Sequence, residues 1–367
     1  MECQRTAPFK TKLNHIVNHD KLVKGLMAKM NGDNQVHDAE INVEGVVPER
    51  QRAASEEIGW YLQLLSTVTR ELQADIWVRK VVVAKNFNAT VSELSSVHKA
   101  YGIAYKAQRR AVRAIGKIIE HIENERISFS LVFDGEVFGS WEERGKAFRF
   151  EKFLHELLHT VLDSVRFERV GAENFYPDEK TVEGVCLSLA LVSRNEYIVD
   201  RIVDRLCPNI LIDDDHQPVQ LAKLYLAEGV DFRATLSELM EKMPDFVSQN
   251  IRDFKLWHMT IDSLWPHMCE FVDELLTVFA HYAAAYDRQE GWLQILADIS
   301  QTPAYRSFLS GHIEAIHSEW QRWFDEPKSD EARSLEAMGN EIRGIFRRCG
   351  LTLANVSSGI YVRVDFV

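Results

Sequence analysis

The segment from Phe153 to Thr160 most constrains what this chain can form, because it places ionisable side chains inside an apolar helical pattern. Leucine and valine recur at helical spacing through and beyond it, at Leu154, Leu157, Leu158, Val161, Leu162 and Val165. Such a stripe is typical of a helix that buries one face against the rest of the protein. We therefore expect a packed helix here.

Two histidines, His155 and His159, stand four residues apart in this helix. Residues at this spacing lie one above the other on the same helix face, so two imidazoles can hold one divalent metal ion. Glu156 projects to the side, where it could reach a water molecule on that metal. The alternative is that both histidines are half-buried polar residues with ordinary hydrogen bonds. His15 and His19 share the spacing without a glutamate, and we interpret them in that second way.

The arrangement of His155, Glu156 and His159 resembles the HExxH motif of zinc metallopeptidases. In the zincin fold of those enzymes, a strand of a small sheet usually borders the cleft beside the active helix. The resemblance implies a zincin-like core, one Zn2+ per chain bound by both histidines, and hydrolysis of peptide bonds. Glu156 would be the general base that takes a proton from the metal-activated water.

A catalytic zinc ion needs a third protein ligand and an open position for water. The run from Asn195 to Asp200 resembles the NExxxD pattern of thermolysin-like peptidases, and its helix resembles that of the ImmA/IrrE family of regulatory metallopeptidases. The resemblance implies a gluzincin site in which Glu196 is the third ligand. Asp200 would accept a hydrogen bond from a ligating histidine.

Alternatives to this ligand set remain open. Glu196 and Asp200 could form a salt-bridged surface with Arg201 and Arg205. Glu183 could replace Glu196 as the third ligand. The residue that would stabilise the oxyanion is open as well, among Tyr197, His216, His258, His267 and Tyr282.

The remaining patterns predict a mainly α chain of the α+β class. Before the HExxH helix, helices are expected at residues 10–30, 48–73 and 91–123, with a strand or a helical continuation near 76–83. Residues 127–133 alternate in polarity, and Asp134-Gly135 predicts a tight turn into residues 136–138. We therefore expect a β-hairpin directly before the HExxH helix.

The chain after the HExxH helix is predicted to be nearly all helical. A helix from Val182 is expected to stop at the polar pair Ser193-Arg194, and a second one to run from Asn195 to Leu206, before Pro208. Further helices are expected at 218–227, 235–243, 246–263, 267–287, 292–300, 304–324 and 331–349, with a strand at 359–366. These patterns suggest an N-terminal helical region (1–125), a zincin-like metal-site core (126–212) and a helical C-terminal region (213–367), packed as one compact unit.

The composition narrows the possible partners. A net charge of −12 with scattered Lys and Arg argues against nucleic acid. The five cysteines show no CxxC spacing, so neither a disulfide framework nor a thiolate zinc site is indicated. Apolar runs are too short to span a membrane and no secretory signal is apparent, so we expect a cytoplasmic protein without a membrane partner.

Two hypotheses follow from the sequence. The first is a cytoplasmic zinc peptidase whose partner is a peptide or protein substrate, with the oligomeric state left open. The second is a non-enzymatic helical protein-interaction module in which the HExxH motif is incidental.

Overall fold

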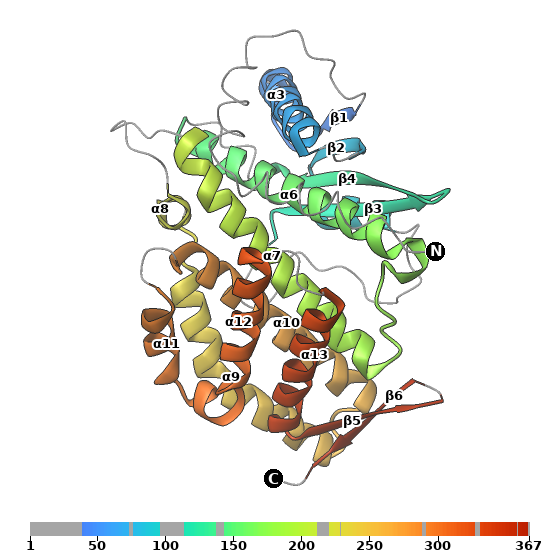
Figure 1. Ribbon diagram of the computed structural model, residues 1–367, viewed down its shortest axis with the longest axis vertical. Coiled ribbons are helices and arrows are strands. Elements are labelled where there is room, and N and C mark those ends of the chain that lie inside the picture. Colours follow the sequence, from blue (N-terminus) through green and yellow to red (C-terminus); the bar gives the residue numbers. More distant parts are fainter. Residues whose placement is uncertain are drawn as a thin grey trace. The chain divides into compact units, whose positions relative to one another are not determined.

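A computed structural model describes residues 39–72, 76–95, 114–136, 143–210, 220–227, 229–287, 291–326, 331–357 and 359–365. This part of the chain is mainly helical with a small sheet, which confirms the predicted mainly α class (Figure 1). The helix predicted at residues 10–30, with His15 and His19, lies outside the described residues, and so does His216.

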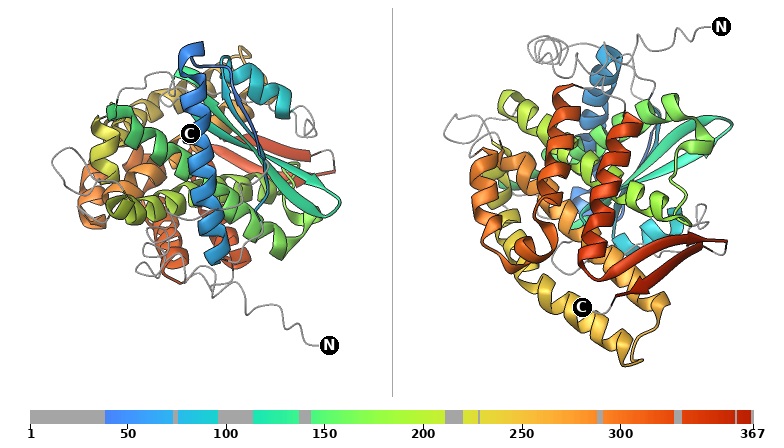
Figure 2. Two further views of the ribbon diagram at one scale, coloured as in Figure 1. Left: turned by 90° about the horizontal axis from the view of Figure 1, so that it is seen from above. Right: turned by 60° about the horizontal axis from the view of Figure 1, so that its bottom comes forward.

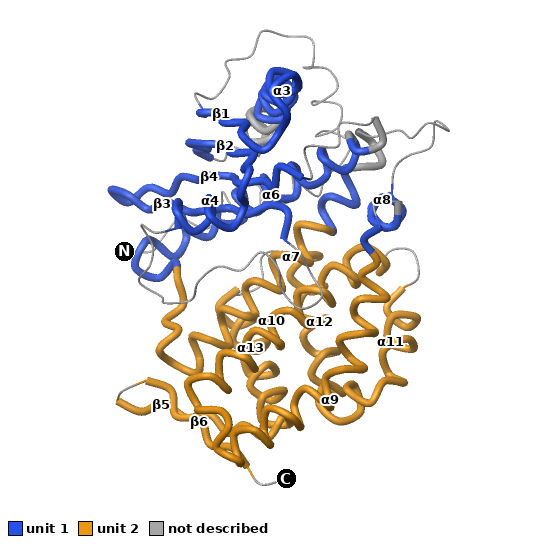
Figure 3. The backbone as a smooth tube through the Cα atoms, turned by 180° about the vertical axis from the view of Figure 1, so that it is seen from behind, with its two compact units in different colours: residues 1–109, 113–175, 201–230 blue, residues 110–112, 176–200, 231–367 orange. Residues whose placement is uncertain are grey.

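The chain divides into two compact units (Figure 3). Unit 1 comprises residues 1–109, 113–175 and 201–230, and unit 2 comprises residues 110–112, 176–200 and 231–367.

Unit 1 contains a four-stranded sheet with the strand order β1-β2-β4-β3. Its strands are β1 (Glu40–Val43), β2 (Val78–Ala84), β3 (Gly116–Glu123) and β4 (Arg126–Asp134). β2 pairs in parallel with β1 and β4, whereas β3 is antiparallel to β4 and lies at an edge of the described sheet. β2 is buried from Val81 to Ala84 and β4 from Ile127 to Asp134, as expected for strands that are covered on both faces.

Helices cover both faces of this sheet (Figure 2). On one face, α4 (Phe87–Leu94) packs Phe87 and Val91 against Val82 and Val132. On the other face lie α3 (Pro48–Leu72) and α6 (Glu143–Val170), where the ring of Phe153 stacks on that of Phe133 with centroids 5.2 Å apart. Neighbouring residues Val132 and Phe133 thus face opposite layers, as the two-residue period of a strand requires.

The predicted hairpin exists, but its strands differ from those expected. β4 pairs with the preceding β3, where the sequence pattern predicted the end of a long helix. Asn124 and Glu125 form the turn with φ of 50° and 59°, the left-handed conformation of the two-residue turns that suit the twist of hairpins. The predicted turn at Asp134-Gly135 is wrong, because Gly135 and Glu136 are helical. Residues 137 and 138 of the predicted second strand lie outside the described residues.

Unit 2 is built of helices and a terminal hairpin. It contains α9 (Phe232–Lys255), α10 (Ile261–Tyr286), α11 (Trp292–Ser300), a π-helix (Tyr305–Leu309), α12 (His312–Asp325), α13 (Glu331–Arg348), β5 (Leu351–Val356) and β6 (Gly359–Val364). The strand predicted at 359–366 is therefore confirmed, whereas its partner β5 was not predicted. α9 continues through Pro244, where the sequence indicated two separate helices.

α7 (Val182–Ile210) belongs to both units and corrects a second prediction. The polar pair Ser193-Arg194 does not interrupt it. Ser193 donates a hydrogen bond from Oγ to the carbonyl of Leu189 at 2.9 Å, and Arg194 Nη1 lies 2.6 Å from a carboxylate oxygen of Glu331. These side chains are buried and find their partners inside the fold, so the helix continues where the pattern suggested a loop. None of the described helices is long and apolar enough to cross a membrane.

Candidate metal centre

α6 forms as predicted, because its apolar stripe is buried along its whole length. All six leucine and valine positions of the stripe are less than 9% exposed. Phe153, at the start of the motif, packs against Phe133 of β4 and against Tyr61 of α3. The backbone that carries His155, Glu156 and His159 is therefore held on both sides by large aromatic and aliphatic groups.

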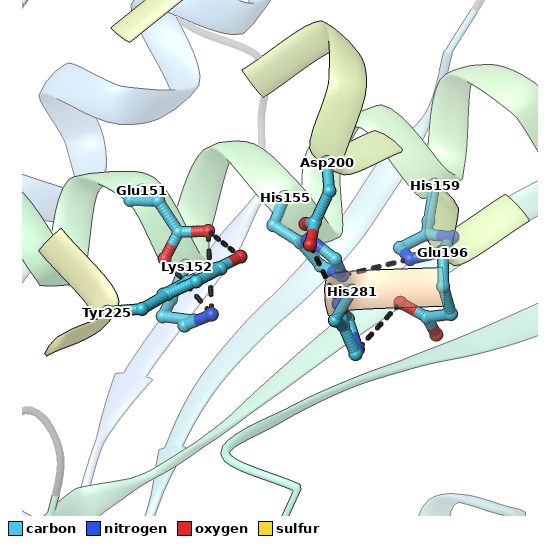
Figure 4. A network of polar contacts seen from close by, with 8 residues as sticks. All are labelled: Glu151, Lys152, His155, His159, Glu196, Asp200, Tyr225 and His281. Atoms are coloured by element: carbon cyan, nitrogen blue, oxygen red, sulfur yellow. Dashed lines mark hydrogen bonds and ion pairs between the residues drawn. The ribbon is translucent and has the colours of Figure 1, made fainter. Parts of the chain in front are cut away.

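The two histidines of α6 converge through the same ring atom. Nε2 of His155 and Nε2 of His159 lie 3.1 Å apart, and the rings are inclined at 68° (Figure 4). Two nitrogens bound to one zinc ion at 2.0–2.1 Å with a tetrahedral angle would be roughly 3.3 Å apart. The observed spacing therefore fits chelation of one metal ion by both rings, and it also permits one imidazole to donate a hydrogen bond to the other.

Glu156 lies against the edge strand β3. A methyl group added to Gly116 would stand 2.5 Å from Oε1 of Glu156, so the carboxylate occupies the space that a side chain at Gly116 would need. Because a strand side chain points out of the plane of the sheet, the Glu156 carboxylate lies over the face of β3 at Gly116.

Asp163, one helical turn after His159, is a half-buried carboxyl on the same helix. Its burial, together with the negative charge of Glu120 on β3, raises its pKa to about 7, although His159, Arg166 and Lys117 act in the opposite direction. Near pH 7, Asp163 is therefore divided between its protonated and ionised forms.

In unit 2, Glu196 and Asp200 lie one turn apart on α7 and share one partner, His281 of α10. Asp200 is fully buried, and its Oδ2 lies 2.8 Å from Nδ1 of His281. Nε2 of the same ring lies 3.6 Å from Oε2 of Glu196, and Phe232 stacks on the ring with centroids 4.7 Å apart. The alternative that Asp200 forms salt bridges on the protein surface is wrong, because its carboxylate is buried.

Glu183 has a different environment. It stands thirteen residues before Glu196 on the same helix, which corresponds to about 20 Å along the axis. Its carboxylate accepts a hydrogen bond from Asn355 and lies 3.3 Å from Arg343, and the hydrogen bond from Asn355 holds its pKa below the usual range. Glu183 is therefore engaged in tying α7 to the terminal hairpin of unit 2.

The candidates for stabilising an oxyanion are not brought together. Tyr197 and Tyr282 are buried and donate their hydroxyl hydrogen bonds to Asp287 at 3.0 Å and Asp298 at 2.8 Å. His258 and His267 are exposed. These four side chains therefore have separate environments within unit 2.

No protein-family model matches the chain, and no curated protein or solved structure matches it significantly. The chemistry of the centre is therefore inferred from its own residues.

Sequence reasoning missed two residues that the structure brings to the candidate ligands. His281 is 81 positions from Asp200, and no local pattern links the two. Glu151 precedes His155 by four residues on α6, a spacing that could have singled it out. Both are labelled in Figure 4.

Proposed function

We propose that the protein is a zinc-dependent metallopeptidase in which His155, His159 and Glu196 bind one zinc ion. The observation that carries the proposal is the 3.1 Å separation of the two Nε2 atoms on the helix that also carries Glu156. Two imidazoles and one carboxylate, together with an open position, are a donor set that catalytic zinc sites use.

The continuity of α7 supports Glu196 as the third ligand in preference to Glu183. The division between the units falls between Asp200 and Arg201, so the residues that follow Glu196 and Asp200 on the same helix belong to the unit of the imidazole pair. Glu183 lies about 20 Å from Glu196, in the first turn of α7, and its carboxylate contacts Asn355 and Arg343.

The side chains have defined roles in peptide hydrolysis. A zinc ion bound here would lower the pKa of its water ligand towards neutrality and polarise the scissile carbonyl. Glu156 would take the proton released from that water and deliver it to the leaving amine. Asp200, through its hydrogen bond with His281, would keep the carboxylate side of the site ordered.

The edge strand β3 supports an extended peptide as the substrate. An edge strand presents backbone N–H and C=O groups that an extended peptide can pair with. Gly116 at the start of β3 touches Glu156, so a peptide paired along this edge would pass the general base. This relation of α6 to β3 is also what supports a zincin-like core.

A cytoplasmic location belongs to the same proposal. Cys186, Cys269 and Cys349 are free thiols in the structure, and persistent free thiols are typical of reducing compartments.

Metal content tests the proposal against an interaction module with an incidental motif. Protein purified without chelators should carry about one zinc ion per chain, and His155→Ala should lose it. Glu156→Gln should keep the zinc while abolishing cleavage of an unfolded protein substrate.

Glu183→Gln serves as the control for Glu196→Gln. The first variant should bind zinc like the wild type, whereas the second should bind it more weakly. Wild-type protein that binds no zinc, or Glu156→Gln protein with full activity, would contradict the proposal.

A further inference from the structure

Glu151 is a completely buried carboxylate that the proposed mechanism does not use. Its side chain has 0% exposure, and a carboxylate in such a place is unstable unless cations or hydrogen-bond donors surround it. Two donors do so in unit 1. Nζ of Lys152 lies 3.1 Å from Oε2, and the hydroxyl of Tyr225 on α8 (Leu221–Ala227) donates to Oε1 at 3.2 Å (Figure 4).

Lys152 is itself fixed by aromatic contacts. Its ammonium group lies 4.4 Å from the ring centroid of Tyr225, and only 12% of its side chain is exposed. Tyr225 therefore holds Glu151 through its hydroxyl and Lys152 through its ring. The carboxylate has a fixed orientation, and it retains acceptor capacity because two oxygens offer about four lone-pair sites.

The neighbour of Glu151 on α6 is His155, one turn later. Side chains on a helix lean towards its N-terminus, so the imidazole of His155 leans towards Glu151. A carboxylate oxygen of Glu151 and a ring nitrogen of His155 lie within 4.8 Å of each other. The ring atom of His155 that faces His159 is Nε2.

A histidine that binds a metal through Nε2 carries its hydrogen on Nδ1, and an acceptor for that hydrogen fixes the ring and its tautomer. The sequence resemblance implied Asp200 for this task. Oδ2 of Asp200 is hydrogen-bonded to Nδ1 of His281 at 2.8 Å. Glu151 can perform the task for His155 from the same helix and the same unit.

We propose that Glu151 is a positioning residue for His155: it accepts the Nδ1 hydrogen of that ring, while Lys152 and Tyr225 hold the carboxylate in place. This inference rests on the proposed function, because it concerns the zinc ligand His155. It adds a residue outside the HExxH and NExxxD motifs to the machinery of the site.

The test is the zinc affinity of Glu151→Gln, measured by competition with a chromophoric chelator. Loss of an acceptor behind a metal-bound histidine typically weakens metal binding by about 10- to 100-fold, and we expect this range. Glu151→Asp should recover part of the affinity. The ring 15N resonances of His155 in the zinc-bound protein should report a change at Nδ1, a signature that a packing defect alone would not produce.

Glu57→Gln is the matched control. Glu57 is a partly buried carboxylate of unit 1, and it is paired with Arg149 of α6 at 3.2 Å. Its substitution should lower thermal stability and leave zinc affinity unchanged. If Glu151→Gln does not fold, Tyr225→Phe removes one of the two groups that hold the carboxylate, and it should weaken zinc binding by several-fold.

The outcomes separate this inference from the proposed function. If the wild type binds zinc, His155→Ala abolishes binding and Glu151→Gln or Tyr225→Phe binds with wild-type affinity, the role of Glu151 is overturned and the metal site stands. If the wild type binds no zinc, the proposed function fails and the role of Glu151 fails with it.

Discussion

Gly116→Ala perturbs the general base without touching a metal ligand. The added methyl group would stand 2.5 Å from Oε1 of Glu156 and 2.8 Å from its Cδ and Cγ. Non-bonded carbon and oxygen atoms normally approach to about 3.5 Å, so the carboxylate must retreat by roughly 1 Å. The carboxylate is the far end of a flexible side chain, and we expect a loss of only about 1 kcal/mol of folding stability.

The expected effect on catalysis is much larger than the effect on folding. A misplacement of about 1 Å in a reacting group can lower the rate about 100-fold, which corresponds to about 2.7 kcal/mol of transition-state stabilisation. Zinc content should stay at the wild-type level, because the methyl group points at Glu156 and not at the imidazole pair.

The assay is the initial rate of cleavage of an unfolded protein substrate, with zinc content and thermal unfolding measured on the same samples. Gly59→Ala on α3 is the control, because a methyl group there meets nothing within 4 Å. It should leave activity unchanged. A Gly116→Ala protein with the wild-type rate, or one that loses zinc in parallel with activity, would refute the assigned position of Glu156.

Three further predictions concern the fold around the site. Trp257 follows α9 with φ of 62° and is 92% exposed, so Trp257→Gly should raise the free energy of unfolding in urea by about 1 kcal/mol; an unchanged or lower value would contradict this. Burial first, and then Glu120, raises the pKa of Asp163 to about 7. The folded state therefore keeps a proton that the unfolded chain releases above about pH 4, so stability should fall as pH rises from 4 to 7, and Asp163→Asn should reduce that fall. If the stability of Asp163→Asn depended on pH as that of the wild type does, this role of Asp163 would be excluded. Glu331→Ala removes the carboxylate that lies 2.6 Å from the buried Arg194 and should lower the free energy of unfolding by about 3–5 kcal/mol. A loss below about 1 kcal/mol would indicate that the pair contributes little to stability.

Local patterns predicted the elements whose signal is contained in one stretch of chain. The apolar stripe of α6, the helix after Pro48 and the helix from Trp292 to Ser300 follow from periodicity alone, and each is confirmed. β3 was missed because its isoleucines fit a helix as well as a strand, and pairing with β4 decides between them. Likewise, the partner that keeps Arg194 inside a continuous α7 is Glu331, which lies far away in sequence.

The same distinction applies to the candidate site. The spacing of His155 and His159 is local, so the sequence placed both imidazoles on one helix face correctly. His281 joins Asp200 from another helix, and only the fold brings them together. The cluster around Glu151 depends on Tyr225, which lies 74 positions away.

Because α7 is one continuous helix, it fixes the direction in which Glu196 and Asp200 point as well as their distance along the helix axis. Each residue of an α-helix advances the chain by 1.5 Å and turns it by about 100°. One residue inserted between Asp200 and Arg201 would therefore turn Glu196 by about 100° relative to the segment after it, although the helix would lengthen by only about 1.5 Å. A seven-residue insertion would restore the angle almost completely and leave a displacement of about 10 Å, so the two variants would separate the contributions of direction and distance to metal binding.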